Sequence, residues 1–431
     1  MKIIRKLVFA GVAAGAFAVA AGAPAQAADF YKGKTIKVVI GYSPGGGYDI
    51  YARAMARYLG DHVPGKPNVI SQNMTGAGSM RAANYLYKIA PKDGTQFGTF
   101  SRGMPMLALT GADKNVRFDP VKFTWIGSSS SYADDAYVFT VRRDKGVKSV
   151  RELMGKNPKL VTFGSTNYGS TGFDVPLVLK DTLGINIKLV HGYPGGSAIN
   201  LAIERKEMDG RTQGLSSLSS MGGDWTKDRI ALLQFARGNV RHPDLADVPT
   251  ARELATREDD RKLIDMLETA FFMARPFAAP PGVAAEPARI LRAAFMAAHK
   301  DARYVKDMGK LGMDISPKSG EEVDKIVARI MNTPKPLLAR YKSIIENPKA
   351  EPRKVNWILS EGTISKVGKK GRIQIKVAGK SKAFKTRMRK GYTKITVNGK
   401  KAKIKSVKEG MTCKIWHEGP KSTAGKAECT K

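Results

Sequence analysis

The strongest constraint on the fold of this chain is a repeated order of short β-branched run, loop rich in Gly, Ser and Thr, and helical stretch. This order occurs twice near the N-terminus and twice in the middle of the chain. Regular alternation of strand and helix predicts an α/β fold, in which helices cover a parallel sheet. The loops that carry the pattern are residues 43–47, 75–78, 165–171 and 193–197.

These loops are candidate anion sites. In open α/β sheets, ligands bind where loops leave the carboxyl ends of the strands. The first turn of each following helix offers unpaired N–H groups and a partial positive charge, and small residues let an anion approach. The alternative for any single loop is a tight turn without a ligand. Their occurrence in two repeated halves favours a two-lobed cleft that grips a carboxylate.

The sequence carries no pattern for catalysis, a metal or a nucleotide cofactor. None of the loops has the Lys of a P-loop, and residues 43–47 lack the GxGxxG spacing. No GxSxG elbow occurs, and the His residues are too far apart in sequence for a paired metal site. We interpret His191, at a strand end, as a packing residue; the alternative is a general base. We therefore expect no enzyme activity, no cofactor and no metal site.

The N-terminus predicts export. Basic residues precede the apolar stretch 7–21, and residues 25–27 form a small-x-small cleavage site, so residues 1–27 are interpreted as a signal peptide. The alternative is an uncleaved membrane anchor. Export permits disulfides, and we expect Cys413 and Cys429 to pair; the alternative is two free thiols.

Positive charge is concentrated at the C-terminal end. Residues 351–431 hold 23 Lys and Arg against 5 acidic residues, within a chain of net charge +35. Alternating apolar and basic residues predict a small antiparallel all-β domain there. Its candidate partner is an anionic surface or polymer; the alternative is a face that is only solvated, because Lys also protects sheet edges. The expected strands are 363–367, 372–377, 394–397 and 403–407, and one helix is expected over 320–346 before the linker.

Five sequence blocks in residues 28–346 share a family's order and spacing. They are Pro44–Arg53 (PGGGYDIYAR), Asn73–Gly78 with 90–94 (APKDG), Tyr193–Ser197 with 207–209 (EMD), Val248–Thr250 with Glu253, and Phe277–Gly282. Together they resemble the solute receptors of tripartite tricarboxylate transporters, the Bug or TctC proteins. The C-terminal basic domain has no counterpart in that family.

The resemblance implies a type II periplasmic binding fold, or Venus flytrap, whose two lobes close on a ligand. It implies a monomeric periplasmic receptor that delivers a small di- or tricarboxylate to inner-membrane transporter subunits. The alternative function is a ligand-sensing or adaptor protein whose basic tail binds an anionic surface. The expected boundaries are 28–134 with 271–346 for lobe 1, 135–270 for lobe 2, 347–352 for a linker and 353–431 for the β-domain.

The resemblance also implies which residues hold the ligand. Main-chain N–H groups and hydroxyls of the first two loops would bind one carboxylate, and the second lobe would complete the site. Phe173 departs from the His of many family members. Arg211 either clamps a second carboxylate or faces solvent, and Asp49 either contacts the ligand or complements the helix dipole. The candidate ligand residues are Tyr42, Ser43, Gly46, Gly47, Tyr48, Asp49, Gly76, Ala77, Gly78, Ser79, Ser165, Thr166, Ser170, Thr171, Tyr193, Gly195, Gly196, Ser197, Asp209 and Arg211.

Overall fold

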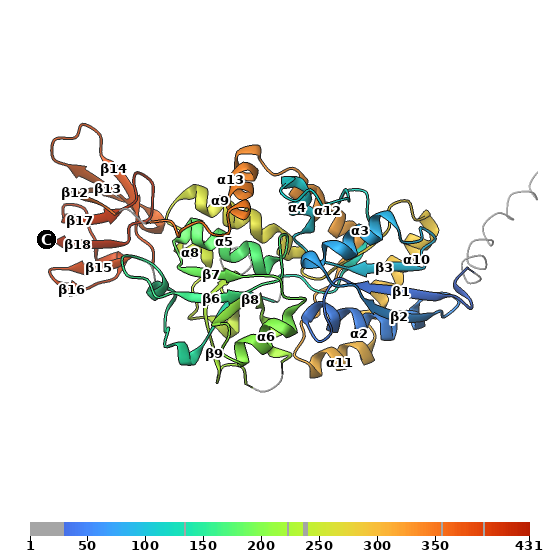
Figure 1. Ribbon diagram of the computed structural model, residues 1–431. Helices are drawn as coiled ribbons and strands as arrows, with labels where there is room; N and C mark the ends of the chain where they lie inside the picture. Colours follow the sequence, from blue (N-terminus) through green and yellow to red (C-terminus); the bar gives the residue numbers. More distant parts are fainter. Residues whose placement is uncertain (1–29, 133–134, 222–223, 236–239, 355–356, 391–392) are drawn as a thin grey trace, which may run out of the picture.

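Three β-sheets lie in a row along the long axis of the molecule (Figure 1). The computed structural model describes residues 30–132, 135–221, 224–235, 240–354, 357–390 and 393–431. The signal peptide expected at residues 1–27 lies outside these ranges. The chain starts in the first sheet, at the right of Figure 1, forms the second sheet, returns to the first sheet with β10 and β11, and ends in the third sheet.

The first sheet has the strand order β11-β4-β10-β3-β1-β2. β1 pairs in parallel with β2 and β3, whereas β10 is antiparallel to β3 and β4. This parallel core is the part that the sequence pattern predicts. The strands are β1 (Thr35–Ile40), β2 (Asn68–Asn73), β3 (Gln96–Thr99), β4 (Thr124–Ser128), β10 (Pro276–Ala279) and β11 (Lys318–Ser319).

Helices cover the first sheet by burying one apolar face each. In α2 (Gly47–His62), Tyr51, Ala52, Met55 and Leu59 are fully buried, which is the spacing expected of one helix face. The other helices around this sheet are α3 (Met80–Lys88), α4 (Met104–Thr110), α10 (Ala285–Ala298) and α11 (Ala302–Lys310).

The second sheet has the order β7-β6-β8-β5-β9, and the chain enters it after β4 and leaves it before β10. β6 pairs in parallel with β7 and β8, and β5 is antiparallel to β8 and β9. The strands are β5 (Tyr137–Arg142), β6 (Val161–Gly164), β7 (Ile187–Val190), β8 (Gly210–Gly214) and β9 (Arg229–Phe235). The accompanying helices are α5 (Thr171–Leu183), α6 (Gly196–Glu204), α7 (Leu215–Ser219), α8 (Ala251–Leu254) and α9 (Glu258–Thr269).

The prediction of a single helix over residues 320–346 is wrong, because the structure has two helices there. α12 (Gly320–Met331) ends three residues before Pro334, and α13 (Lys335–Glu346) begins directly after it. Pro lacks the N–H that would continue the first helix, so the helix ends before it.

α13 packs on α5, where the Tyr341 hydroxyl donates to Asp174 Oδ2 at 2.8 Å. Burial raises the pKa of Asp174 to about 7.

The third sheet forms a C-terminal β-module, in the order β14-β13-β12-β17-β18-β15-β16. The predicted all-β character is confirmed, although β15 and β18 pair in parallel. The strand expected at 403–407 is wrong, because Ile404–Ser406 forms a 3-10 turn that places Val407 in the core. The strands are β12 (Ile358–Val367), β13 (Arg372–Val377), β14 (Phe384–Arg387), β15 (Lys394–Val397), β16 (Lys400–Lys401), β17 (Thr412–His417) and β18 (Lys426–Thr430).

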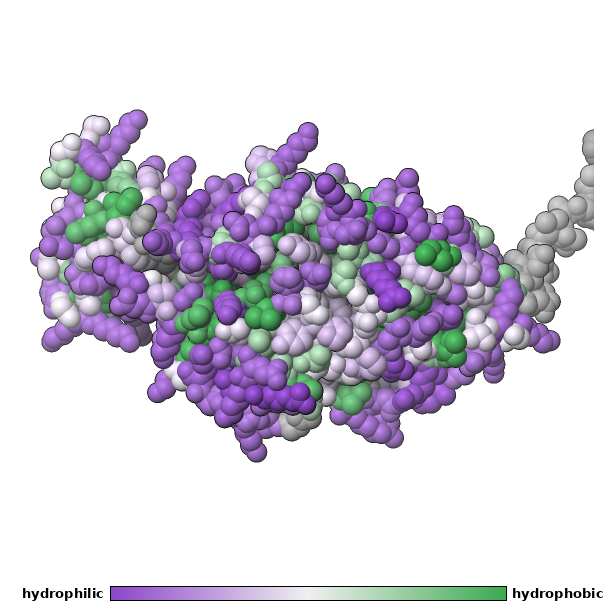
Figure 2. Space-filling view, viewed as in Figure 1, coloured by the Kyte–Doolittle hydropathy of each residue, from purple (hydrophilic) through white to green (hydrophobic). Residues whose placement is uncertain are grey.

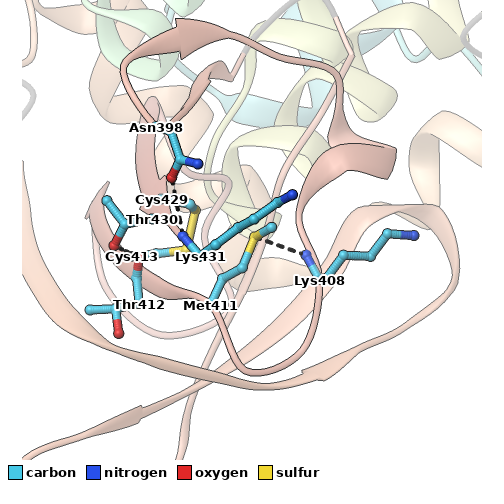
Figure 3. Close-up of a disulfide and its surroundings, with 8 residues drawn as sticks. All are labelled: Asn398, Lys408, Met411, Thr412, Cys413, Cys429, Thr430 and Lys431. Carbon is cyan, nitrogen blue, oxygen red and sulfur yellow. Dashed lines mark hydrogen bonds between the residues drawn. A yellow bond between two sulfur atoms is a disulfide. The ribbon is translucent and has the colours of Figure 1, made fainter.

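Cys413 and Cys429 form a disulfide between β17 and β18, where they face each other in the antiparallel register (Figure 3). In the face shown in Figure 2, hydrophilic residues lie mainly along the outer margins, and pale or hydrophobic residues gather near the middle. Across the described part of the chain, no helix has both the length and the apolar character to cross a membrane.

Candidate ligand-binding cleft

The loops that follow the strands of the first and second sheets meet between them. The Ser43 N–H donates to the Pro194 carbonyl at 3.2 Å, and the Ser43 and Ser197 hydroxyls are 3.4 Å apart. The Ser101 hydroxyl, after β3, donates to the Gly169 carbonyl at 2.7 Å. The two lobes are therefore in direct contact at the mouths of their Gly-rich loops, as in a closed flytrap.

A cavity of about 100 Å³ lies among these loops, and we call it the cleft. Both sheets and the returning chain before β10 contribute to its wall. Its lining contains Gly-rich backbone, Tyr rings, hydroxyls and guanidinium groups. The lining residues are Tyr42, Gly45, Gly46, Gly47, Tyr48, Arg102, Tyr137, Thr166, Ser170, Thr171, Gly172, Gly196, Ile199, Asn200, Arg211, Gln213, Gly214, Ser217, Ser220, Met221 and Arg275.

Arg102 reaches the cleft from the loop after β3. Its side chain is almost fully buried, at 2% exposure, and its Nε and Nη1 have no hydrogen-bond partner among the described residues. Burial would lower the pKa of Arg102, but nearby phenol groups raise it above the ordinary value. The guanidinium carbon lies 5.3–6.0 Å from the ring centroids of Tyr48, Tyr132, Tyr137 and Phe271.

Arg275 and Arg211 reach the same cavity from the chain before β10 and from β8. The Arg275 guanidinium donates to the Ser217 hydroxyl at 2.6 Å, and the Arg211 guanidinium donates to the Gly196 carbonyl at 2.7 Å. Each retains a buried Nε without a partner among the described residues. Burial lowers the pKa of Arg211 to about 10, and neighbouring cations act in the same direction.

The cleft is thus strongly electropositive. The described lining residues include three guanidinium groups and no acidic side chain. Buried cations that face a cavity without an acidic lining residue raise the free energy of the ligand-free protein, and an anion that pairs with them lowers it. The groups can donate charge-assisted hydrogen bonds, and they can do so from both lobes. This chemistry favours binding of a small multivalent anion.

Comparisons with known proteins agree with this geometry. No known protein-family profile matches the chain. A UPF0065 protein from the gbd 5' region of Cupriavidus necator is 26% identical over 337 residues, which span 77% of this chain and 95% of that protein. MatC from Rhodopseudomonas palustris with bound malate has a TM-score of 0.54 and 19% identity, over 72% of this chain and 99% of its own. The periplasmic binding protein BugD has a TM-score of 0.54 and 17% identity, over 75% and 100%.

The chain shares the fold of these neighbours, among them the periplasmic binding protein BugD. A further neighbour, an R. palustris protein solved with adipate, has a TM-score of 0.54 and 18% identity, over 74% of this chain and 99% of its own. The predicted resemblance and the two-lobed fold are confirmed at this level. The neighbours match about three quarters of the chain, a share close to that of residues 28–346.

Nine of the candidate ligand residues line the cleft: Tyr42, Gly46, Gly47, Tyr48, Thr166, Ser170, Thr171, Gly196 and Arg211. The solvent-facing alternative for Arg211 does not hold, since its guanidinium lies in the cleft wall. The remaining candidate ligand residues lie outside the lining of the cleft. They are Ser43, Asp49, Gly76, Ala77, Gly78, Ser79, Ser165, Tyr193, Gly195, Ser197 and Asp209. Several of these residues hold the loops in place instead of facing the cavity.

Asp49 is one such supporting residue. Its carboxylate accepts from the Gly45 N–H at 2.9 Å, from Asn73 Nδ2 at 2.8 Å and from Arg53 Nε at 2.9 Å. All of these partners belong to the loop, the helix and the neighbouring strand. Asp49 therefore fixes the Gly-rich loop from behind and repels no anion in the cleft.

Asp209 lies at the end of β8 that is remote from the cleft. Its carboxylate accepts from the Thr162 N–H at 2.8 Å and pairs with Lys145 Nζ at 3.1 Å. Residue 211, two positions later, already lies in the cleft wall. Of these two candidate residues, Asp209 therefore forms a structural ion pair, and Arg211 lines the cleft.

Phe173 and His191 lie behind the second-lobe loops. Phe173 is fully buried, and its ring centroid is 5.3 Å from that of His191 in an edge-on arrangement. Neither residue lines the cleft. His191 itself is exposed and touches Phe173 with one side of its ring, so its role as a packing residue stays a prediction.

The sequence did not indicate Arg102, Tyr137, Gln213, Ser217 or Arg275 as cleft residues. Arg102 follows a strand without a Gly-rich loop, and Arg275 interrupts an apolar stretch at the point where the chain crosses between lobes. A lone Arg inside an otherwise buried run is the signal that would have found Arg275, because buried charges are rare without a partner.

We expect Gly78→Ala to weaken ligand binding by hindering closure. Gly78 has φ +62°, and an added methyl group would lie 3.1 Å from the carbonyl oxygens of Asn167 and Tyr168 in the opposite lobe. A penalty of about 1 kcal/mol in the closed state corresponds to roughly five-fold weaker binding. Gly146→Ala is the matched control, since Gly146 has φ +69° and open space around it. Equal calorimetric affinities of the two variants would contradict the role of Gly78 in closure.

Proposed function

We propose that this chain is a non-enzymatic periplasmic solute receptor of the Bug and TctC type. It captures a small organic dicarboxylate or tricarboxylate between its lobes and delivers the ligand to inner-membrane subunits of a tripartite tricarboxylate-type transporter. The observation that carries the proposal is the convergence of Arg102, Arg211 and Arg275 on one cavity without an acidic lining residue among those described. MatC and the adipate-bound neighbour, which carry carboxylates in their structures, support the same class of ligand.

The origin of the cleft residues supports a mechanism of lobe closure. Arg102 comes from the first lobe and Arg211 from the second, and Arg275 comes from the chain that returns between them. A ligand with separated carboxylates bridges these groups only when the lobes are closed. It therefore stabilises the closed state by its differential affinity, and the closed state is what a transporter would recognise.

The size of the cleft favours dicarboxylates over larger anions. A water-sized group needs about 10–15 Å³ of such space. The cavity of about 100 Å³ is only several times that minimum, so it suits a small ligand. Short dicarboxylates are therefore the ligands to test first.

A thermal-shift screen of mono-, di- and tricarboxylates tests the proposal. A ligand present at about a thousand times its Kd stabilises the folded state by about 4 kcal/mol, which raises the Tm of a unit of about 320 residues by roughly 6 °C. We expect the largest shift with short dicarboxylates and little shift with monocarboxylates. A protein whose Tm does not respond to any carboxylate would exclude this function.

A ligand-sensing or adaptor protein is the alternative function. The basic C-terminal β-module favours it, because the family does not need such a module to bind a solute. Transporter genes beside the gene for this chain would favour delivery, and their absence together with an intact ligand response would favour sensing.

A further inference from the structure

The C-terminal β-module is docked on the second lobe through specific polar contacts. The Thr423 N–H donates to the Thr256 carbonyl at 2.9 Å, and Arg261 Nη2 donates to the Thr423 hydroxyl at 2.7 Å. Arg389 Nη1 donates to the Arg252 carbonyl at 2.9 Å. A concavity between the module and α9 is therefore held by defined contacts on both sides.

This concavity, the junction groove, has a volume of about 690 Å³. Seven of its lining residues are basic and one is acidic. They lie on the first turn of α9, at the end of β12, on β13 and β14, on the turn between β12 and β13, and on the loop between β17 and β18. The lining residues are Glu258, Arg261, Lys366, Gly368, Lys369, Arg372, Ile373, Gln374, Lys385, Thr386, Arg387 and Lys421.

The cations of the junction groove are almost all unpaired. Glu258, the acidic residue, accepts from Arg261 Nη1 at 2.8 Å and is therefore already neutralised. The other six basic side chains form no hydrogen bond or ion pair with any described residue. They are Lys366, Lys369, Arg372, Lys385, Arg387 and Lys421.

Arg372 and Arg387 are directly opposite each other in the antiparallel register of β13 and β14. Like charges at opposite positions of an antiparallel pair destabilise a sheet. Burial and the neighbouring Arg261 and Arg372 lower the pKa of Arg387, which reports the same crowding of cations. The sequence thus retains a cross-strand Arg pair that the fold alone disfavours.

A phosphate group is the chemistry that would relieve this repulsion. Guanidinium groups present planar donor pairs that match phosphate oxygens bidentately, and a concave wall focuses their field. One phosphate between two opposed Arg side chains would satisfy both. The surrounding Lys side chains supply further positive charge for a second anionic group.

We propose that the junction groove is a binding site for a phosphate-bearing ligand, with Arg372 and Arg387 as its main contacts. The ligand is either a soluble phosphorylated molecule or the headgroup of an anionic lipid. Trp357, Ile358 and Leu359 of the same module are 40–51% exposed but do not line the groove, so a membrane surface is one of the two sources that the test distinguishes. This site is separate from the carboxylate cleft.

The test uses the full mature chain and pyrophosphate as the probe in calorimetry at low ionic strength. We expect Arg372→Gln/Arg387→Gln to weaken pyrophosphate binding by about ten-fold or more, because charged hydrogen bonds are lost. Lys400→Gln/Lys401→Gln is the matched control, since it removes the same charge from the exposed strand β16 outside the groove. Thermal melting checks folding, and the Arg variant should melt no lower than the parent because repulsion is removed.

A second arm separates the two sources of phosphate. Sedimentation with phosphatidylglycerol vesicles, and with phosphatidylcholine vesicles as the neutral reference, is repeated in the presence of pyrophosphate. Vesicle binding that pyrophosphate displaces and the Arg variant loses supports a lipid headgroup, whereas pyrophosphate binding without vesicle binding supports a soluble ligand. The absence of both, or an equal loss in the Arg and Lys variants, would overturn the site.

Discussion

Replacing Arg102 by Met is expected to abolish carboxylate binding and to leave the ligand-free protein at least as stable as the parent. Arg102 is buried in the cleft with two donor nitrogens that have no partner among the described residues. A carboxylate would accept from those nitrogens, and each charge-assisted hydrogen bond contributes about 1.5–3 kcal/mol. Losing two of them costs about 3 kcal/mol or more, which is more than a hundred-fold in Kd.

The effect of Arg102→Met on stability has the opposite sign to that of most core substitutions. Met fills a similar volume without the desolvation penalty of a buried charge, which is several kcal/mol and is opposed in the parent by the attraction of the surrounding rings for the guanidinium. The surrounding rings of Tyr48, Tyr132 and Tyr137 can pack on the thioether. We therefore expect the free energy of unfolding, measured by urea denaturation without ligand, to stay constant or rise.

Arg81→Met is the matched control for this experiment. Arg81 lies in α3, is exposed, and does not line the cleft. Arg and Met have similar helix propensities, so this variant isolates the loss of a surface charge. Retained carboxylate affinity in Arg102→Met, or an equal loss in Arg81→Met, would show that Arg102 does not hold the ligand.

The sequence predicts the Gly-rich loops of the cleft better than it predicts the charged residues that line the cleft. Gly-rich stretches after β-branched runs form a clear local pattern, so the sequence alone predicts residues 43–47 and 165–171 as loops of the cleft. Arg102 and Arg275 leave no local pattern, because their meeting in one cavity depends on how distant strands pair. β8 also escaped prediction, since Gly210–Gly214 contains no apolar residue and is a strand only through its neighbours.

Acidic residues show the same limit. The blocks that resemble the receptor family make Asp49 and Asp209 ligand candidates, yet both carboxylates are occupied by structural partners. The spacing of residues in the sequence shows that a residue is near a strand end. It does not show whether its side chain faces the cavity or the protein behind the loop. The distinction between supporting a loop and lining its cavity is set by tertiary contacts.

Removing the disulfide of the C-terminal β-module is expected to unfold that module selectively. Cys413 and Cys429 are almost fully buried and join β17 to β18 in the module core (Figure 3). In the chain-entropy model, closing a loop of about 15 residues contributes about 3 kcal/mol. A single core of fewer than roughly 80 residues rarely supplies more than 3–5 kcal/mol, so the module depends on the bridge.

The test compares the parent with Cys413→Ala/Cys429→Ala by differential scanning calorimetry. Ala is chosen because a Ser hydroxyl would be buried without a partner. We expect the transition of the module to move to much lower temperature, while carboxylate binding in the cleft is unchanged. The chain has only these two cysteines, so a reducing agent should reproduce the effect in the parent and leave the variant unaffected. A module transition that survives both treatments would mean that packing against α8 and α9, and not the bridge, holds the module together.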